Sequence, residues 1–185
     1  MPSSQVSRRW LLSVTATTVV AAAGCLEESD ADDTEPDEKT VEDLETEHLR
    51  TDAPDPIVSV ADADDADHSM LLLENDDVSD LEFAGDPDGL EDVRSFLEGV
   101  DYGDATVVVY QGEVSECHER RVEYVRGNEE TFDLEFCRVT RDADVECETD
   151  QTALQATFVE IPFAYDSPPN YSVGSSSSCR TEVER

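Results

Sequence analysis

Basic residues are scarce in this chain of 185 residues. Only 12 lysines and arginines stand against 47 aspartates and glutamates, and Lys39 is the single lysine. No cluster of basic residues is present to neutralise phosphates, so the composition excludes nucleic acid as a partner. It also disfavours docking on an anionic lipid surface by charge alone.

The common motifs of catalysis are missing as well. The sequence contains no Gly-x-Ser-x-Gly elbow, no His-Glu-x-x-His helix, no P-loop and no dinucleotide fingerprint. The three histidines, His48, His68 and His118, have no motif around them. We therefore expect no catalytic residue and no cofactor, and we favour a non-enzymatic protein.

One acidic run resembles the beginning of a calcium loop. Asp62 to Asp67 supplies alternating carboxylates, but the glycine at position six is absent and Leu73 stands where the bidentate glutamate belongs. Acidic runs in so acidic a chain are typically solvated surface. We expect no metal ion here.

No apolar stretch is long enough to cross a membrane. The longest, Trp10 to Ala23, would extend about 21 Å as a helix, against a hydrocarbon core about 30 Å thick, and several Ser and Thr residues interrupt it. Arg8 and Arg9 precede it and no acid does, which is the layout of an export signal. The run from Ser7 to Leu12 resembles the twin-arginine consensus.

Small residues end this segment. Ala22, Ala23 and Gly24 precede Cys25, and together they resemble the lipobox of bacterial and archaeal lipoproteins. This implies a signal peptide over residues 1–24, cleavage before Cys25 and a lipid on its thiol. Two acyl chains suffice for stable anchoring, so we expect a lipid-anchored protein on the extracellular face of the cell membrane.

All of the acids lie beyond Cys25. The mature chain has 10 basic and 47 acidic residues, a formal charge of −37. Such a charge repels itself in dilute buffer, but near 1 M salt the Debye length falls to about 3 Å and the repulsion is screened. The composition is typical of an extreme halophile, and twin-arginine export of lipoproteins is similarly a habit of haloarchaea.

The mature chain divides into two parts. Residues 25–55 are rich in Asp, Glu, Thr and Pro and poor in large apolar residues, so we expect a disordered acidic tether. Apolar clusters recur from Pro56, which predicts one globular domain over residues 56–182.

The pattern of that domain is mostly strands. We expect short strands at residues 57–60 and 70–73, a central strand at 106–110 and a hairpin around Gly127-Asn128. A helix should begin after Asp88, capped by that residue and Glu91, and end at Gly99. Two further expectations concern the C-terminal half: a bulged strand near Phe158, and a loop from Ser167 to Ser178. The fold class is therefore α+β and mainly β, a small antiparallel sheet or sandwich with one helix packed on it.

Four cysteines remain after Cys25: Cys117, Cys137, Cys147 and Cys179. An even number in an exported chain indicates two disulfides, and three connectivities are possible. A tight turn near residues 141–143 would pair Cys137 with Cys147, whereas one near 126–128 would pair Cys117 with Cys137. The alternative is a metal, redox or hydrolytic site using Cys117, His118 and nearby acids.

The C-terminal loop carries a possible modification site. Asn170-Tyr171-Ser172 is an N-glycosylation sequon, so Asn170 is a candidate for a glycan. The serines from Ser175 to Ser178 fit either an O-glycosylated patch or a flexible loop, and we favour the loop.

Two segments carry a further resemblance. Phe96 to Tyr102 followed by Ala105 to Gly112, and later Ala156 to Phe163, resemble the C-terminal domain of protease-complex-stability-type lipoproteins. The glycine-glycine-tyrosine turn of that family is replaced here by Glu113 to Glu119. The resemblance implies a compact β-rich domain. The sequence as a whole predicts a binding or envelope module whose partner is an unknown protein or small molecule.

Overall fold

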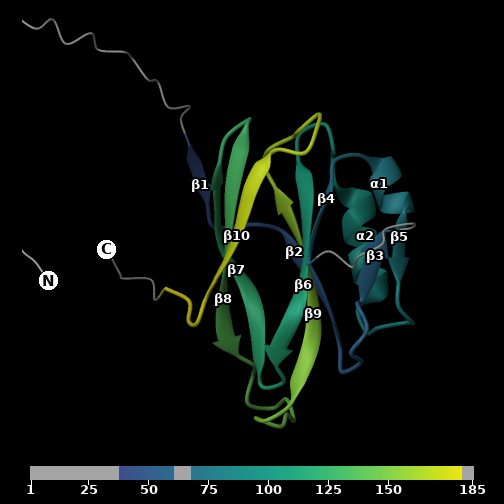
Figure 1. Ribbon diagram of the computed structural model, residues 1–185, viewed down its shortest axis with the longest axis vertical. Helices are drawn as coiled ribbons and strands as arrows, with labels where there is room; N and C mark the ends of the chain where they lie inside the picture. The colour runs from purple at the N-terminus through teal and green to yellow at the C-terminus, as the bar shows by residue number, and fades with distance from the viewer. Residues whose placement is uncertain (1–37, 61–67, 181–185) are drawn as a thin grey trace, which may run out of the picture. The chain divides into compact units, whose positions relative to one another are not determined.

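The computed structural model describes residues 38–60 and 68–180 (Figure 1). Two four-stranded sheets dominate these residues. The first has the order β1-β7-β8-β10 and is formed by Lys39–Val41, His118–Gly127, Thr131–Thr140 and Asn170–Ser176. The second has the order β2-β9-β6-β4 and is formed by Thr46–Thr51, Thr152–Ile161, Thr106–Ser115 and Ser69–Leu72.

Smaller elements complete the fold. Strands β3 (Val58–Val60) and β5 (Leu81–Phe83) form a two-stranded ribbon. Helix α1 covers Asn75–Ser79, and helix α2 covers Leu90–Gly99. None of the helices described is long and apolar enough to cross a membrane.

The β2-β9-β6-β4 sheet is buried on both faces. One face packs against α2 and the β3-β5 ribbon through residues such as Val107, Phe158 and Leu97. The other packs against the β1-β7-β8-β10 sheet through residues such as Val108 and Phe136. The unbroken valine run of β6 thus has a core on each side, as the sequence predicts. The expected mainly β fold, a sandwich with a helix packed on it, is confirmed, with two disulfides.

Strand β9 is covered on both faces too, and this corrects the expected bulge. It pairs with β6 from Thr152 to Ile161 without a shift of register. Ala156 and Phe158 face α2, whereas Val159 and Ile161 face the other sheet. Apolar residues occur on both faces of β9 because each face packs against a different core, and the strand itself is regular. The bulge lies instead in β7, between Val122 and Tyr124.

The expected tether is too long at its C-terminal end. Strands β1 and β2 lie within residues 25–55, and they pair with β7 and β9. Leu49 is fully buried between β9 and α2. These short polar strands have little apolar signal of their own, since they are stabilised by joining an existing sheet.

The expected loop after Ser167 contains a strand. β10 pairs with β8 in parallel, from Asn170 opposite Thr131 to Ser176 opposite Cys137. Its Ser and Gly content suggested a loop, but Tyr171 and Val173 alternate inward onto the core between the sheets. The Tyr171 ring stacks on Phe132, with centroids 5.2 Å apart.

Candidate anion-binding site

Two arginines lie directly opposite each other on neighbouring strands. Arg120 on β7 and Arg138 on β8 are register partners. Each stands two residues from an inward-facing apolar side chain, Val122 and Phe136 respectively, so both face the other sheet. Like charges in this position destabilise a sheet unless something compensates them.

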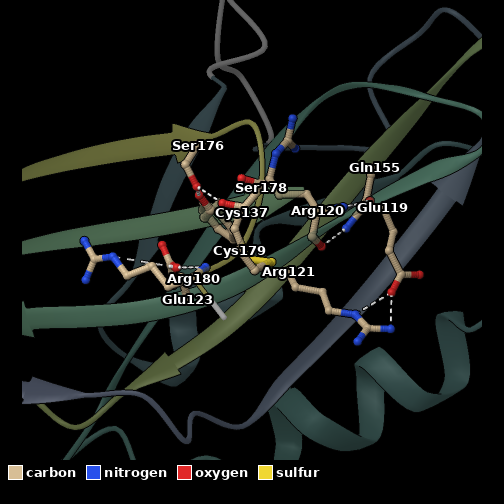
Figure 2. The surroundings of a disulfide bond; sticks show 11 residues. Glu119, Arg120, Arg121, Glu123, Cys137, Gln155, Ser176, Ser178, Cys179 and Arg180 are labelled. Atoms are coloured by element: carbon tan, nitrogen blue, oxygen red, sulfur yellow. Dashed lines mark hydrogen bonds and ion pairs between the residues drawn. A yellow bond between two sulfur atoms is a disulfide. The ribbon is translucent and has the colours of Figure 1, made fainter. Parts of the chain in front are cut away.

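Arg120 is held in place from several directions. Its guanidinium carbon lies 4.8 Å from the Tyr110 ring centre and 5.9 Å from that of Phe136. Gly112 on β6 leaves room for it, because a Cβ there would stand 3.4 Å from Nη2. Gln155 on β9 accepts a hydrogen bond from the Arg120 N–H at 2.9 Å and donates to its carbonyl at 2.7 Å (Figure 2). The guanidinium is therefore fixed between the sheets.

Neither arginine has a carboxylate partner among the described residues. Nη2 of Arg120 donates to the Glu113 carbonyl at 3.2 Å, while its Nη1 is buried without a hydrogen-bond partner in that part of the chain. The side chain of Arg138 forms no ion pair or hydrogen bond there. Burial lowers the pKa of Arg120 below its usual value, and the opposing electrostatic interaction comes from Tyr110. An uncompensated, partly buried cation costs free energy that a bound anion would offset.

The arginines line a cleft of about 340 Å³ together with several hydroxyl-bearing residues. The hydroxyls belong to Ser115, Thr152 and the serines Ser175 to Ser177. Glu113 also lines the cleft but forms no ion pair with either arginine. Planar guanidinium groups with neighbouring hydroxyls are the donors that bind carboxylate and phosphate groups. The volume suits a small ligand.

A second pair of arginines has a structural role. Arg50 on β2 donates to the carbonyls of Ser115, Glu116 and His118 at 2.9 to 3.2 Å, and so holds the turn between β6 and β7. Arg141 donates to the Glu116 carbonyl as well, at 3.2 Å. The backbone already accepts hydrogen bonds from both of these arginines, whereas Nη1 of Arg120 and the guanidinium of Arg138 have no such partner among the described residues.

A larger surface hollow lies elsewhere on the described part of the chain. A depression of about 1040 Å³ lies among the loops before β8 and β10, and its lining includes Lys39, Glu129, Glu130 and Asp166. The Tyr165 hydroxyl at its base is already bonded to the Asn128 carbonyl at 2.8 Å. Its lining has four acids against the one cation Lys39, which is exposed, so it offers no partly buried cation like the Arg120 guanidinium.

The four cysteines form two disulfides, as expected, but with the connectivity that neither turn predicted. Cys117 bonds to Cys147, and Cys137 bonds to Cys179 (Figure 2). The turn between β7 and β8 falls at residues 128–130 and not at 126–128, so Arg121 lies opposite Cys137, and this removes the pairing of Cys117 with Cys137. Cys137 and Cys147 are separated because β8 and β9 belong to different sheets.

The alternative site around Cys117 and His118 changes accordingly. The Cys117 sulfur is bonded to Cys147, so it would serve as a metal or redox ligand only after reduction. The Nδ1 atom of His118 is buried without a hydrogen-bond partner among the described residues. The described ranges contain no group of three or more His, Cys, Asp or Glu that could hold a metal ion. The calcium-like run Asp62 to Asp67 lies outside those ranges.

Asn170 is the first residue of β10 and is exposed. The Ser172 hydroxyl of its sequon donates to Asp133 and, ahead of Arg126, holds the pKa of that carboxyl below its usual value. Glycosylation of Asn170 stays a prediction.

The remaining predicted sites fall outside the described residues: Arg8, Arg9, Ala22, Ala23, Gly24 and Cys25.

Sequence reasoning missed Arg120 and Arg138 altogether. The two residues are 18 positions apart, and only the β7-β8 register and the neighbouring sheet bring them together. The sequence offers one hint only. Basic residues are so scarce that two arginines close together in space would be unusual. No protein-family model, curated protein or solved structure matches the chain.

Proposed function

We propose that the chain is a non-enzymatic binding module of an extreme halophile, held on the extracellular face of the cell membrane by a lipid on Cys25. Arg8 and Arg9 with the following apolar segment support export, and the small residues before Cys25 support lipidation. The surplus of 47 acidic over 12 basic residues supports the saline environment.

The binding site of this module is the cleft at Arg120 and Arg138, and its ligand is a small anion bearing a carboxylate or phosphate group. The observation that carries this proposal is the pair of opposed arginines that line one cleft and have no carboxylate partner among the described residues. In a chain with about four acids for each base, carboxylates were abundant as partners. Leaving two arginines without one keeps their donors available to a ligand.

The acidity of the chain does not prevent anion binding in concentrated salt. At a Debye length of about 3 Å, a ligand in the cleft is insulated from acids elsewhere on the surface. The contacts within the cleft then decide the affinity. The guanidinium fork and the hydroxyls favour an oxyanion over chloride, because several directional hydrogen bonds can form at once.

Thermal unfolding of the full-length chain in about 3 M KCl, with added potassium phosphate or citrate, tests the site. A ligand that binds the folded state at a hundred times its Kd stabilises it by about 2.7 kcal/mol, which would raise the Tm by several degrees. The decisive variant is Arg120→Met, which removes the guanidinium but keeps an apolar stem between Tyr110 and Phe136.

Arg121→Met is the matched control. Arg121 is the next residue on β7, and it is exposed and paired with Glu119. Phosphate also stabilises proteins by exclusion from their surface, and that part should be equal in all three proteins. The expected result is an additional rise in Tm for the wild type and Arg121→Met that Arg120→Met lacks. An equal rise in all three, or no effect of either oxyanion beyond chloride, would refute the anion site.

A further inference from the structure

On one side of the sandwich, the edge strands of both sheets carry no charged side chain. These two edge strands lie together, since the hydroxyls of Ser69 on β4 and Tyr171 on β10 are 3.0 Å apart. Residues 69–73 and 167–179 contain no acidic or basic side chain, and 167–179 is the longest uncharged run in the described part of the chain. Acids surround it elsewhere, so this side is a marked exception.

The opposite edges are charged. Strands β1 and β2 carry or adjoin Glu38, Glu45, Glu47 and Asp52. Natural sheets protect their edges from pairing with other chains by charges of this kind. The chain has 47 acids, yet it places none on β10.

The outer edge of β10 is open to pairing. β10 pairs with β8 on one side, and no other described backbone segment hydrogen-bonds to it. The strand is also preformed. Tyr171 and Val173 anchor its inner face in the core, and the Cys137–Cys179 disulfide holds its C-terminal end against β8. A partner strand therefore would not need to order β10 on binding.

We propose that β10 pairs with β10 of a second copy of this chain, antiparallel across a two-fold axis, so that the β1-β7-β8-β10 sheet continues through both copies. Near the two-fold axis of such an interface, a residue lies close to the same residue of the second chain. A charged residue there would therefore face a like charge, which is destabilising. An uncharged strand avoids this repulsion. A basic partner would instead gain from an acidic edge, so the bare edge favours a partner as acidic as this chain.

The proposal does not rest on anion binding or on the lipid, although Ser175 and Ser176 of β10 also line the anion cleft. Pairing over seven residues forms a small interface, so we expect a weak dimer whose population depends on concentration. Sedimentation equilibrium of the full-length chain in detergent and about 3 M KCl, from low micromolar to about 1 mM protein, should show a mass rising toward twice that of the monomer.

Cysteine cross-linking then locates the interface. Ser172→Cys and Ser175→Cys place single thiols on opposite faces of β10 at exposed positions, where antiparallel pairing brings residues near the axis close to their own copies. Thr40→Cys, exposed on the charged β1 edge, is the matched control. Under mild oxidation, the expected result is a reducible dimer from one or both β10 variants and little from Thr40→Cys. A monomer over the whole concentration range, or cross-linking of Thr40→Cys as efficient as that of the β10 variants, would overturn the proposal.

Discussion

At the scale of single residues, two tyrosines with buried hydroxyls, Tyr102 and Tyr165, differ in one respect. The hydroxyl of Tyr165 donates to the Asn128 carbonyl at 2.8 Å, whereas that of Tyr102 is buried without a partner among the described residues. Burial raises the pKa of both to about 12, and Asp77 and Glu160 contribute further at Tyr102. The pair separates the effect of a hydrogen bond from the effect of burial.

We predict that Tyr165→Phe lowers the free energy of unfolding at pH 7 by about 1 kcal/mol, because the Asn128 carbonyl loses its donor. Tyr102→Phe should be neutral or slightly stabilising at the same pH, since no bond is lost. Urea unfolding in concentrated salt measures both. A Tyr102→Phe variant as unstable as Tyr165→Phe would contradict this account.

The same two variants test the alkaline pH dependence. The unfolded chain ionises its tyrosines near pH 10, while these folded tyrosines stay neutral to about pH 12. Their contribution to stability is therefore complete below pH 10 and is lost as the pH rises to 12, by at most about 3 kcal/mol for each. Either variant should reduce the fall in unfolding free energy between pH 10 and 12. An unchanged slope would show that burial does not shift these tyrosines.

At the scale of elements, the start of α2 differs from the expected capping box. Asp88 provides no cap, and Gly89 is the N-cap residue, with a φ of 90° that only glycine adopts readily. We predict that Gly89→Ala destabilises the protein by about 1–2 kcal/mol. An added Cβ would stand 3.5 Å from the His48 carbonyl oxygen, which is ordinary contact, so the cost is conformational.

Gly99→Ala is the control at the other end of α2. Nothing lies within 4 Å of a Cβ at that position, and alanine is the better helix former. Gly99→Ala should be neutral or up to about 1 kcal/mol more stable in the same urea unfolding experiment. Equal losses at both glycines would show that the backbone conformation of Gly89 is not what the helix requires.

How far the sequence predicts an element depends on where that element gets its stability. The valine run of β6, the β7-β8 hairpin and the apolar stripe of α2 bury large side chains of their own, and all three are as expected. Strands β1, β2 and β10 are polar and form because a neighbouring strand offers them backbone partners. The sequence of such a strand does not show which strand it will pair with.

The candidate site was unpredictable for a related reason. The pairing of Arg120 with Arg138 depends on the β7 bulge, and a slip of one residue would turn one side chain to the other face. The position of the β7-β8 turn likewise excluded one disulfide pairing, because it sets Arg121 and not Cys117 opposite Cys137. Register is a property of the sheet as a whole, so neither result could be read from residue spacing.

At the scale of the whole molecule, charge is distributed in three ways. Acids are spread along most of the described sequence, two arginines without a carboxylate partner line one cleft, and the edge strands β4 and β10 are uncharged. In concentrated salt, long-range repulsion is screened and each of these regions acts over a few ångströms only. A single acidic chain can therefore combine solubility, an anion site and a self-pairing edge.

The proposed location depends on Cys25 alone, because the acidic surface gives no attraction to an anionic membrane. Two acyl chains bind by hydrophobic burial, at about 0.8 kcal/mol per CH₂, and salt does not weaken this. We predict that the wild-type chain stays in the membrane fraction through washes in about 3 M salt. Cys25→Ser should move it to the medium.

Replacing Arg8 and Arg9 with lysine separates anchoring from export. That variant should be retained inside the cell in precursor form, whereas Cys25→Ser should leave the cell. Mass spectrometry of the mature N-terminus completes the test, with a lipid-modified Cys25 as the first residue expected. If Cys25→Ser remained with the membranes, or if the mature chain began far from Cys25, another part of the molecule would have to hold it there.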